Sequence, residues 1–375
     1  MRIGFDARLV YYRQAGIGQY ILHLVQGLAR LVGPNRQGEC ELWVFRSHRA
    51  PALDLPEWVH QAGLWTPSHH RFESAGLTAE LVGKRLSLLH SPDFIPPFSG
   101  GFRSVITIHD LNFIHFPEFL TPESERYYGQ IHRAVERADH IIVDSNWTRQ
   151  DVIKELGVSP ERVTTVYLAA NPVYRPITDL QEVRRAVMRY GLPNDFIIFV
   201  GTLEPRKNVP TLLRAFRQLR DQGYGVHLAV VGRKGWLYED IFATLTDLKL
   251  ADYVHFLENV PNKDLVRLYN AARCLALPSH YEGFGLPPLE AMACGTPVVV
   301  SNRASLPEVV GEAGLLVDPD RPEELSAALA RVLSDHTLRA SLSQRGMIRA
   351  NSFSWARAAD ETLAVYRQVL QKETL

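Results

Sequence analysis

Two glutamates flank a glycine-rich segment late in the chain, in the run SHYEGFGLPPLEAMACG at Ser279–Gly295. Glu282 precedes Gly-Phe-Gly, and Glu290 follows two prolines that suit the first turn of a helix. Gly283–Leu286 is then a loop whose backbone N–H groups face an anion, as at phosphate-binding helix starts. A carboxylate accepts two hydrogen bonds, so either glutamate can hold adjacent hydroxyls of a ribose or a hexose. The alternative is that Glu290 only complements the helix dipole and Glu282 is solvated.

Two adjacent cations follow the apolar run FIIFVGT at Phe196–Thr202, in the sequence GTLEPRK. Arg206 and Lys207 come just after the carboxyl end of a predicted buried strand, where a pyrophosphate would need charge neutralisation. A helix is expected to open at Asn208, so this loop also lies near a helix N-terminus. Taken alone, such a pair is more often a solvated turn, but both features favour the same anionic ligand.

Two weaker candidates lie in the N-terminal half. The sequence GIG at Gly16–Gly18 follows the first predicted strand, so glycine would allow close backbone approach to a phosphate. It lacks the last glycine of the G-x-G-x-x-G fingerprint, which argues against a dinucleotide oxidoreductase. His109 and Asp110 come at the carboxyl end of the predicted strand Ser104–His109, and His109 is a functional candidate for that reason, although a lone histidine is more often structural.

The elements that would hold these residues are short apolar runs alternating with amphipathic stretches, the pattern of parallel sheets covered by helices. The predicted strands are Arg2–Phe5, Glu41–Phe45, Leu86–His90, Ser104–His109, His140–Ser145 and Val163–Tyr167, then Phe196–Thr202, Val226–Val231, Val254–Leu257, Cys274–Leu277 and Val298–Ser301. We therefore expect an α/β fold of two doubly wound, Rossmann-like domains that face a central cleft, with ligands at the carboxyl ends of the strands.

Prolines and helix signals set the expected domain limits. Two prolines in Asn171–Pro176 predict an interdomain linker, because proline restricts both itself and the residue before it. The expected parts are an N-terminal domain at 1–175, a C-terminal domain at 176–352 and a final helix at 353–375, with Ser354 as its N-cap.

Composition narrows the kinds of partner. A chain of 375 residues exceeds what one hydrophobic core supports, which favours two domains. Lys+Arg and Asp+Glu both number 41, so no charge excess indicates a nucleic acid partner. The three cysteines have no metal-like spacing and suit a reducing compartment. The start has no signal-peptide pattern and no apolar run reaches about 18 residues, so we expect a cytoplasmic protein.

Together these motifs resemble glycosyltransferase family 4, the large retaining family of GT-B fold. EGFGLPPLE is similar to its E-x7-E motif, GTLEPRKN to its phosphate-contacting loop and GIG to its N-terminal glycine loop. HDLNFIHFPE is similar to the corresponding stretch in the bacterial mannosyltransferase-like branch of that family. The resemblance covers essentially the whole chain, including SLPEVVGEAGLLVDP and the final helix, which in this fold crosses back onto the N-terminal domain.

The resemblance implies roles for the charged residues. Glu290 would hold the ribose hydroxyls of the donor nucleotide, and Glu282 would contact the transferred sugar near its 3- and 4-hydroxyls. Arg206 and Lys207 would neutralise the diphosphate. Many relatives have an arginine where this chain has Thr202, so Arg206 would take over that charge.

The remaining contacts implied by the resemblance come from both halves of the chain. His109 would contact the 6-hydroxyl of the sugar or lie beside the reacting carbon, and the nucleotide base would lie near Arg233 and the loop that begins at Glu258. The implied donor-binding residues are Gly16, Gly18, Arg206, Lys207, Arg233, Asn259, Val260, Glu282, Gly283, Phe284, Gly285, Leu286 and Glu290, and the implied catalytic residues are His109, Glu282, Lys207 and Arg206.

The expected activity is transfer of a hexose, with retention of anomeric configuration, from a nucleotide-diphosphate sugar to a saccharide or lipid-linked saccharide. The resemblance to the bacterial mannosyltransferase-like branch favours mannose from GDP-mannose, and a UDP-hexose is the alternative donor. Fixed cations and N–H dipoles would stabilise the leaving diphosphate, which would accept the proton of the attacking hydroxyl. An epimerase of the same fold is disfavoured by the E-x7-E segment, and a non-catalytic binding subunit by the presence of both glutamates, Lys207 and His109.

No metal or other cofactor is expected. Asp318 and Asp320 spell a D-x-D sequence, but they come between a strand and a helix, where carboxylates serve as turn and cap residues. Because acceptors in this branch are typically lipid-linked or polysaccharide chains, loose attachment to the inner membrane surface is an open alternative. The segment Ala79–Leu89 would supply either a basic amphipathic face or, more simply, a core-facing helix.

Overall fold

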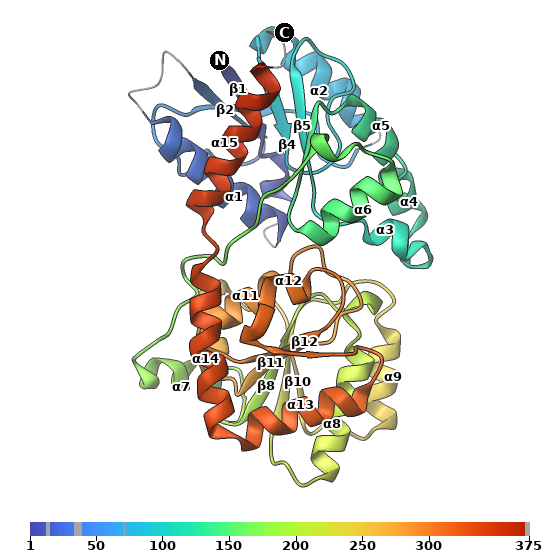
Figure 1. The fold of residues 1–375 in the computed structure, drawn as a ribbon, viewed down its shortest axis with the longest axis vertical. Helices are drawn as coiled ribbons and strands as arrows, with labels where there is room; N and C mark the ends of the chain where they lie inside the picture. Colours follow the sequence, from blue (N-terminus) through green and yellow to red (C-terminus); the bar gives the residue numbers. More distant parts are fainter. Residues whose placement is uncertain (13–15, 34–39, 71, 372–375) are drawn as a thin grey trace. The chain divides into compact units, whose positions relative to one another are not determined.

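The structure is a computed structural model that describes residues 1–12, 16–33, 40–70 and 72–371 (Figure 1). The chain forms two compact units, one of Met1–Leu168 with Ser354–Leu375 and the other of Ala169–Phe353. Each unit is a parallel sheet with helices packed on it. Central strands of such sheets are buried on both faces, which explains their continuous runs of Val, Ile, Leu and Phe.

The first unit contains a seven-stranded sheet in the order β3-β2-β1-β4-β5-β6-β7. Its strands are β1 (Arg2–Asp6), β2 (Glu41–Ser47), β3 (His60–Leu64), β4 (Leu88–Ser91), β5 (Arg103–Ile108), β6 (His140–Val143) and β7 (Val163–Thr165). The strand order reverses between β1 and β4, which pair directly through Ile3 and Leu88. Doubly wound sheets bind ligands beyond the carboxyl ends of the strands at such a reversal.

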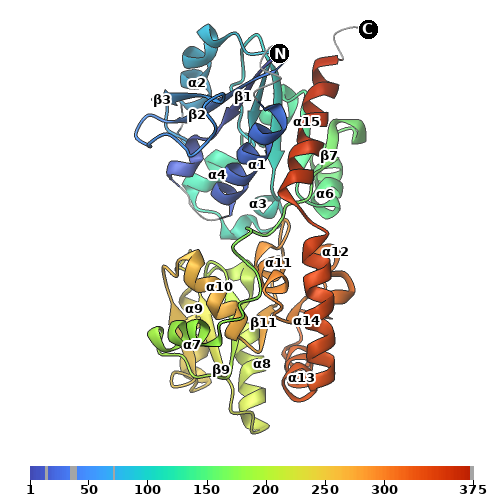
Figure 2. The same ribbon diagram turned by 90° about the vertical axis from the view of Figure 1, so that its left-hand side faces the viewer.

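Helices cover this sheet, and the end of the chain supplies one of them. They are η1 (Arg8–Tyr11), α1 (Ile17–Val32), α2 (Glu73–Leu81), η3 (Val82–Lys84), α3 (Asn112–His115), η4 (Pro117–Phe119), α4 (Pro122–Tyr128), α5 (Ile131–Arg137), α6 (Asn146–Leu156), η5 (Pro160–Arg162) and α15 (Trp355–Gln371). Helix α15 lies beside α1 (Figures 1 and 2). The close approach requires Gly27, because a Cβ there would lie 2.7 Å from the Cβ of Ala359. Tyr366 also reaches the sheet, with its hydroxyl 2.6 Å from Nδ1 of His90.

The second unit contains a six-stranded sheet in the order β10-β9-β8-β11-β12-β13. Its strands are β8 (Phe196–Val200), β9 (His227–Val231), β10 (Val254–Leu257), β11 (Cys274–Leu277), β12 (Val298–Ser301) and β13 (Leu315–Val317). Its helices are α7 (Leu180–Arg189), η6 (Pro205–Lys207), α8 (Val209–Asp221), α9 (Glu239–Asp247), α10 (Asn262–Ala271), α11 (Leu286–Ala293), α12 (Leu306–Val310), η7 (Gly311–Ala313), α13 (Pro322–Ser334) and α14 (His336–Asn351). Here the order reverses between β8 and β11.

The two-sheet α/β architecture expected from the sequence is confirmed, and the predicted strands are present, three with the predicted ends and the others with ends shifted by one or two residues. Ser354 caps α15, because its hydroxyl oxygen accepts the backbone N–H of Arg357 at 3.2 Å. The segment Asn171–Pro176 belongs to the second unit, which begins at Ala169. It packs there, with the ring of Tyr174 edge-on to Tyr269.

The helix expected within Ala79–Leu89 is wrong for most of that segment. Helix α2 ends at Leu81, a single 3-10 turn follows, and β4 begins at Leu88. Leu86, Leu88 and Leu89 are buried in the core of the first unit, so they do not form an amphipathic face. None of the helices in the described part of the chain is both long and apolar enough to cross a membrane.

Candidate functional site

The second unit brings the two predicted anion-binding motifs together at its strand reversal. The loop after β8 carries Arg206 and Lys207, and the loop after β11 leads to Glu282. Because β8 and β11 are hydrogen-bonded neighbours, their carboxyl ends meet at one edge of the sheet. The backbone N–H of His280 donates to the carbonyl of Arg206 at 2.8 Å, which ties the two loops to each other.

Glu282 is the centre of a buried charge network. Lys207 Nζ lies 2.5 Å from its Oε1, Arg206 Nη1 lies 3.2 Å from its Oε2, and the Ser279 hydroxyl donates to Oε1 at 2.8 Å. Arg206 Nε also pairs with the carboxylate of Glu204 at 2.6 Å. Two cations therefore face two carboxylates, so the cluster is electrically balanced before any ligand binds.

Burial and pairing shift the pKa values in this network. Burial alone would raise the pKa of Glu282, but Lys207 and Arg206 hold it below its ordinary value. Burial, and next the nearby Arg206 charge, lower the pKa of Lys207. Both side chains are almost fully covered, each at 8% exposed. A buried ion pair needs a partner for each charge, so a bound anion would have to share these cations with Glu282.

The N-terminus of α11 lies directly after this network. Its N-cap, Gly285, has φ of 107°, a conformation that favours glycine, and no described side chain caps the helix. The hydroxyl of Ser305 lies 2.8 Å from the carbonyl oxygens of both Glu282 and Phe284, which fixes the loop. Pro287 occupies the first helical turn as predicted. The segment Gly283–Leu286 thus leads into a helix start of the kind that binds anions.

Glu290 lies one turn further along α11 in a different environment. It is half-buried, and the Tyr269 hydroxyl donates to its Oε2 at 3.1 Å. Burial raises the pKa of Glu290 to about 8, which the Tyr269 hydrogen bond only partly offsets. In the free protein this carboxyl is therefore protonated through much of the neutral range and can both donate and accept hydrogen bonds.

The residues expected near the nucleotide base lie at the same edge of the sheet. Arg233 follows β9, is exposed and accepts the backbone N–H of Leu203 through its carbonyl. Asn259 and Val260 follow β10, and Asn259 is exposed with φ of 55°. Since β8, β9 and β10 are parallel neighbours, these side chains start from the edge that carries the charge network.

The first unit holds the N-terminal candidates. Gly16 has φ of 39° and precedes α1, whereas Gly18 is buried within the first turn of that helix. His109 follows β5, with Nδ1 2.6 Å from Asp144 and Nε2 2.9 Å from the carbonyl oxygen of Pro92. Because both ring nitrogens face acceptors, the ring is a doubly protonated donor.

The imidazolium state of His109 follows from its surroundings. Burial lowers the pKa of His109, but the carboxylate of Asp144 outweighs that effect and raises it to about 9. Both N–H groups are engaged within the first unit, so the expected contact between His109 and a sugar hydroxyl stays a prediction. Asp144, which the sequence analysis does not single out, follows the apolar strand β6 just as His109 follows β5.

Asp318 and Asp320 are turn residues in an ion-pair cluster. Arg303 Nη2 lies 3.0 Å from Asp318 and 2.5 Å from Asp320, and the N–H of Asp320 donates to Asp318. Within the described ranges, no three His, Cys, Asp or Glu side chains are grouped as metal ligands.

Comparison with known proteins places this geometry in a family. Residues 185–349 match the model of "Glycosyl transferases group 1" and residues 15–173 that of "Glycosyltransferase Family 4". The O-antigen chain mannosyltransferase B of Escherichia coli is 33% identical over 98% of this chain and 100% of its own length. A D-inositol 3-phosphate glycosyltransferase of Thermobifida fusca is 32% identical over 67% of this chain and 60% of its own.

Solved structures agree on the fold. Sucrose-phosphate synthase from Thermosynechococcus elongatus superposes with a TM-score of 0.80 at 22% identity, covering 99% of this chain and 100% of the other. WaaG, a glycosyltransferase involved in lipopolysaccharide biosynthesis, gives a TM-score of 0.75 at 18% identity, covering 97% and 99%. With the relative that matches over its full length, these findings show that the chain belongs to glycosyltransferase family 4 and is a glycosyltransferase of GT-B fold.

Proposed function

We propose that this glycosyltransferase transfers mannose from GDP-mannose to a saccharide acceptor with retention of anomeric configuration. The observation that carries the proposal is the similarity to the O-antigen chain mannosyltransferase B, which extends over 98% of this chain and the whole of that relative. Proteins named as serotype-specific mannosyltransferase WbdA are also 28–29% identical over 74% of this chain. A saccharide or lipid-linked saccharide is the corresponding acceptor class.

The donor would bind to the charge network of the second unit. Its diphosphate would lie at the N-terminus of α11 and would share Lys207 and Arg206 with Glu282, to which both are paired. Glu290 would hold the ribose hydroxyls. A protonated or ionised carboxyl can hydrogen-bond a diol, so the raised pKa of Glu290 is compatible with this role.

The proposed chemistry needs no protein nucleophile. The bond between the anomeric carbon and the diphosphate oxygen breaks, the acceptor oxygen bonds to that carbon on the same face, and the acceptor proton passes to the departing diphosphate. Negative charge grows on the leaving group, where preorganised cations and N–H dipoles act most strongly. No divalent metal would be required.

A UDP-hexose is the second donor candidate. Anabaena Alr3699/HepE, solved in complex with UDP and glucose, shares the fold with a TM-score of 0.74 at 19% identity. The fold of that neighbour therefore accommodates a uridine nucleotide.

Thermal unfolding with GDP, UDP and their sugars tests the donor. A ligand at 100 times its dissociation constant adds about 2.7 kcal/mol of stability. We expect GDP and GDP-mannose to raise the melting temperature and UDP to leave it nearly unchanged; the reverse order would transfer the proposal to a UDP-hexose.

Proton NMR of the product tests whether the anomeric configuration is retained, because an inverted anomeric signal would overturn same-face attack. Sedimentation with liposomes tests whether the protein attaches weakly to membranes.

A further inference from the structure

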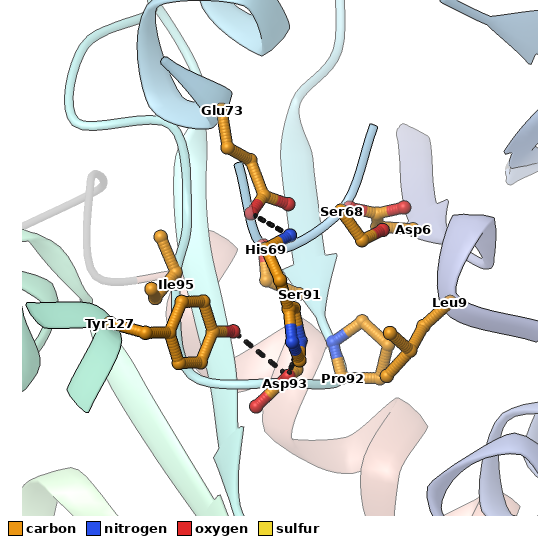
Figure 3. Close-up of a pocket in the computed structure, with 10 residues that line it drawn as sticks. All are labelled: Asp6, Leu9, Ser68, His69, Glu73, Ser91, Pro92, Asp93, Ile95 and Tyr127. Atoms are coloured by element: carbon orange, nitrogen blue, oxygen red, sulfur yellow. Dashed lines mark hydrogen bonds and ion pairs between the residues drawn. The ribbon is translucent and has the colours of Figure 1, made fainter. Parts of the chain in front are cut away.

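The first unit has a polar pocket at its own strand reversal (Figure 3). Asp6 ends β1 and Ser91 ends β4, the two strands between which the order reverses. The pocket therefore occupies the same place in its sheet as the charge network in the second sheet. Its polar lining is Asp6, Ser68, His69, Glu73, Ser91, Asp93 and Tyr127. This is a second position where a doubly wound fold binds ligands.

Asp93 and His69 form the polar pair of the pocket. His69 Nε2 lies 2.7 Å from Asp93 Oδ2, and the Tyr127 hydroxyl donates to the same oxygen at 3.0 Å. Figure 3 shows these contacts from one side of the pocket. Burial alone would raise the pKa of Asp93, but the His69 hydrogen bond and charge bring it below its ordinary value. Asp93 is thus a carboxylate at neutral pH.

His69 is held in a backbone conformation that side chains rarely adopt. Its φ is 62°, its N–H donates to Glu73 Oε2 at 2.7 Å, and its ring lies 4.1 Å from the ring of Tyr127. Residues fixed in this region of φ cluster at ligand sites, where the surrounding contacts hold them. The contacts here hold the imidazole against Asp93 before any ligand arrives.

The charge of the pocket excludes anions. Its carboxylates are Asp6, Glu73 and Asp93, and the nearby guanidinium of Arg8 is used by two of them, at 2.7 Å from Asp6 and 2.6 Å from Glu73. The Arg8 side chain is 1% exposed, so it is not available to a ligand. A phosphate or carboxylate placed here would meet like charges.

One buried hydroxyl in the pocket lacks a partner. Ser91 is 2% exposed, and its Oγ makes no hydrogen bond among the described residues. Leaving a buried polar group unsatisfied is costly, and a hydroxyl brought by a ligand would satisfy it. Together with Asp93 and His69, Ser91 offers both donors and acceptors to one uncharged polar group.

The size of the pocket limits what it can hold. Its volume is about 20 Å³, and it is partly open to solvent. A water needs roughly 10–15 Å³ of such space, so the pocket takes a hydroxyl or hydroxymethyl group but not a sugar ring. It adjoins His109, because the carbonyl of Pro92, next to Asp93, accepts the His109 Nε2–H.

We propose that this pocket binds one hydroxyl or hydroxymethyl group of an uncharged acceptor sugar and selects against acceptors that carry phosphate or carboxylate at that position. The inference rests on the proposed function, since it assigns the acceptor class of the same transferase. Asp93 and Ser91 are the residues that hydrogen-bond the hydroxyl, and His69 positions Asp93.

Steady-state kinetics of the full-length protein tests the pocket, with GDP-mannose as donor and methyl α-mannoside as acceptor. Asp93→Asn should raise the acceptor KM by about 10-fold or more, because a hydrogen bond to a charged group is lost. The donor KM and the thermal stabilisation by GDP should not change. Ser91→Ala, a smaller change, should raise the acceptor KM in the same direction. Asp54→Asn, at an exposed carboxylate of the same unit, is the matched control and should behave as wild type.

Acceptor analogues identify the group that the pocket reads. Of the monodeoxy methyl mannosides, the one that lacks the hydroxyl bound by the pocket should be a poor acceptor for wild type. The Asp93→Asn substitution should not raise the KM of that analogue further. Methyl α-mannoside 6-phosphate should be a poorer acceptor than methyl α-mannoside if the pocket reads the hydroxymethyl group.

Each remaining outcome has one meaning. An increase in the donor KM instead would assign the pocket to the donor sugar and overturn the acceptor role. An unchanged acceptor KM in folded Asp93→Asn and Ser91→Ala would overturn the inference while leaving the transferase intact. Absence of mannosyl transfer by wild type would instead contradict the proposed function, and the same kinetic comparison would then be made with the donor that is active.

Discussion

At the scale of single residues, the two glutamates of the E-x7-E segment lie in different environments, although they flank the same loop in the sequence. Glu282 is ionised and paired with two cations, whereas Glu290 is half-buried, with a tyrosine hydroxyl as hydrogen-bond donor and a raised pKa. Lys207 and Glu282 are 75 residues apart in the chain, so no local pattern could reveal that they pair. The motifs predicted which residues gather, but not that the cations and Glu282 neutralise one another.

The contrast between the glutamates predicts different kinetic effects. Glu282→Gln should chiefly lower kcat, by about 10- to 1,000-fold or ~1.4–4 kcal/mol, because it alters the charge balance around the leaving group. Glu290→Gln should mainly raise the donor KM, because a ribose contact is equally strong in the ground and transition states. Calorimetry with free nucleotide provides the check. If only Glu282→Gln weakened nucleotide binding, the two roles would be exchanged.

The pair of His109 and Asp144 predicts a pH dependence of stability. The folded-state pKa of His109 is about 9 and its ordinary value is 6.5, so its contribution is complete below pH 6.5 and is lost as pH rises through about 9. The loss should be up to about 3 kcal/mol, since one pKa unit corresponds to 1.36 kcal/mol. The free energy of unfolding in urea should therefore fall between pH 6.5 and 9.5.

Asp144→Asn separates this effect from other alkaline titrations. Glu290, whose folded-state pKa is also raised, loses stability over an overlapping range, but it does so equally in wild type and variant. The difference between the two proteins should thus be large at pH 6.5 and small at pH 9.5. A difference that stays constant with pH would show that His109 is not charged by Asp144.

At the scale of elements, the sequence predicts every central strand of the two described sheets, and of their four edge strands it predicts β7 and β10. Strands β10, β11 and β12 have the predicted bounds, because each is a short apolar run. Strands β3 and β13 are not predicted: both lie at sheet edges, β3 reads HQAGL, and β13 has only three residues. Edge strands are covered less and need no continuous apolar run, so periodicity misses a strand such as β3, and β13 is too short to give a pattern.

The same limit applies to the pocket of the first unit. Asp93 and His69 lie in loops, and their contact depends on the order of strands rather than on spacing along the chain. The positions of the strand reversals follow from the order of the strands in each sheet, and the sequence does not predict that order. The second site was therefore accessible only from the structure.

The ends of β8 and β9 approach so closely that only glycine fits between them. A Cβ at Gly232 would lie 1.9 Å from the backbone carbonyl oxygen of Gly201, the residue that opens the loop to Lys207. Gly232→Ala should force these ends apart, cost about 1–3 kcal/mol of stability and weaken nucleotide binding. Gly83→Ala, with open space around its Cβ, is the matched control. Normal nucleotide affinity in Gly232→Ala would show that the position of this loop does not affect the donor site.

At the scale of the whole molecule, charge is balanced and anion binding has to be local. The chain has 41 basic and 41 acidic residues, so no overall field attracts a nucleotide. The two sheets differ in the groups at their strand reversals: in the second unit two cations paired with two carboxylates beside a helix N-terminus, and in the first a pocket with three carboxylates and hydroxyls. This difference fits an enzyme that takes one anionic and one uncharged substrate.

Because the second unit supplies its own cations, we predict that transfer proceeds without added divalent metal. Arg206, Lys207 and the α11 N-terminus would neutralise the growing charge on the diphosphate, the task that a bound metal performs in other transferases. The rate of mannosyl transfer in EDTA should therefore equal the rate in Mg²⁺ within about twofold. Complete loss in EDTA with recovery on adding Mg²⁺ or Mn²⁺ would contradict this. In that case Asp318 and Asp320 would become the first carboxylates to replace, because a metal could displace Arg303 from them.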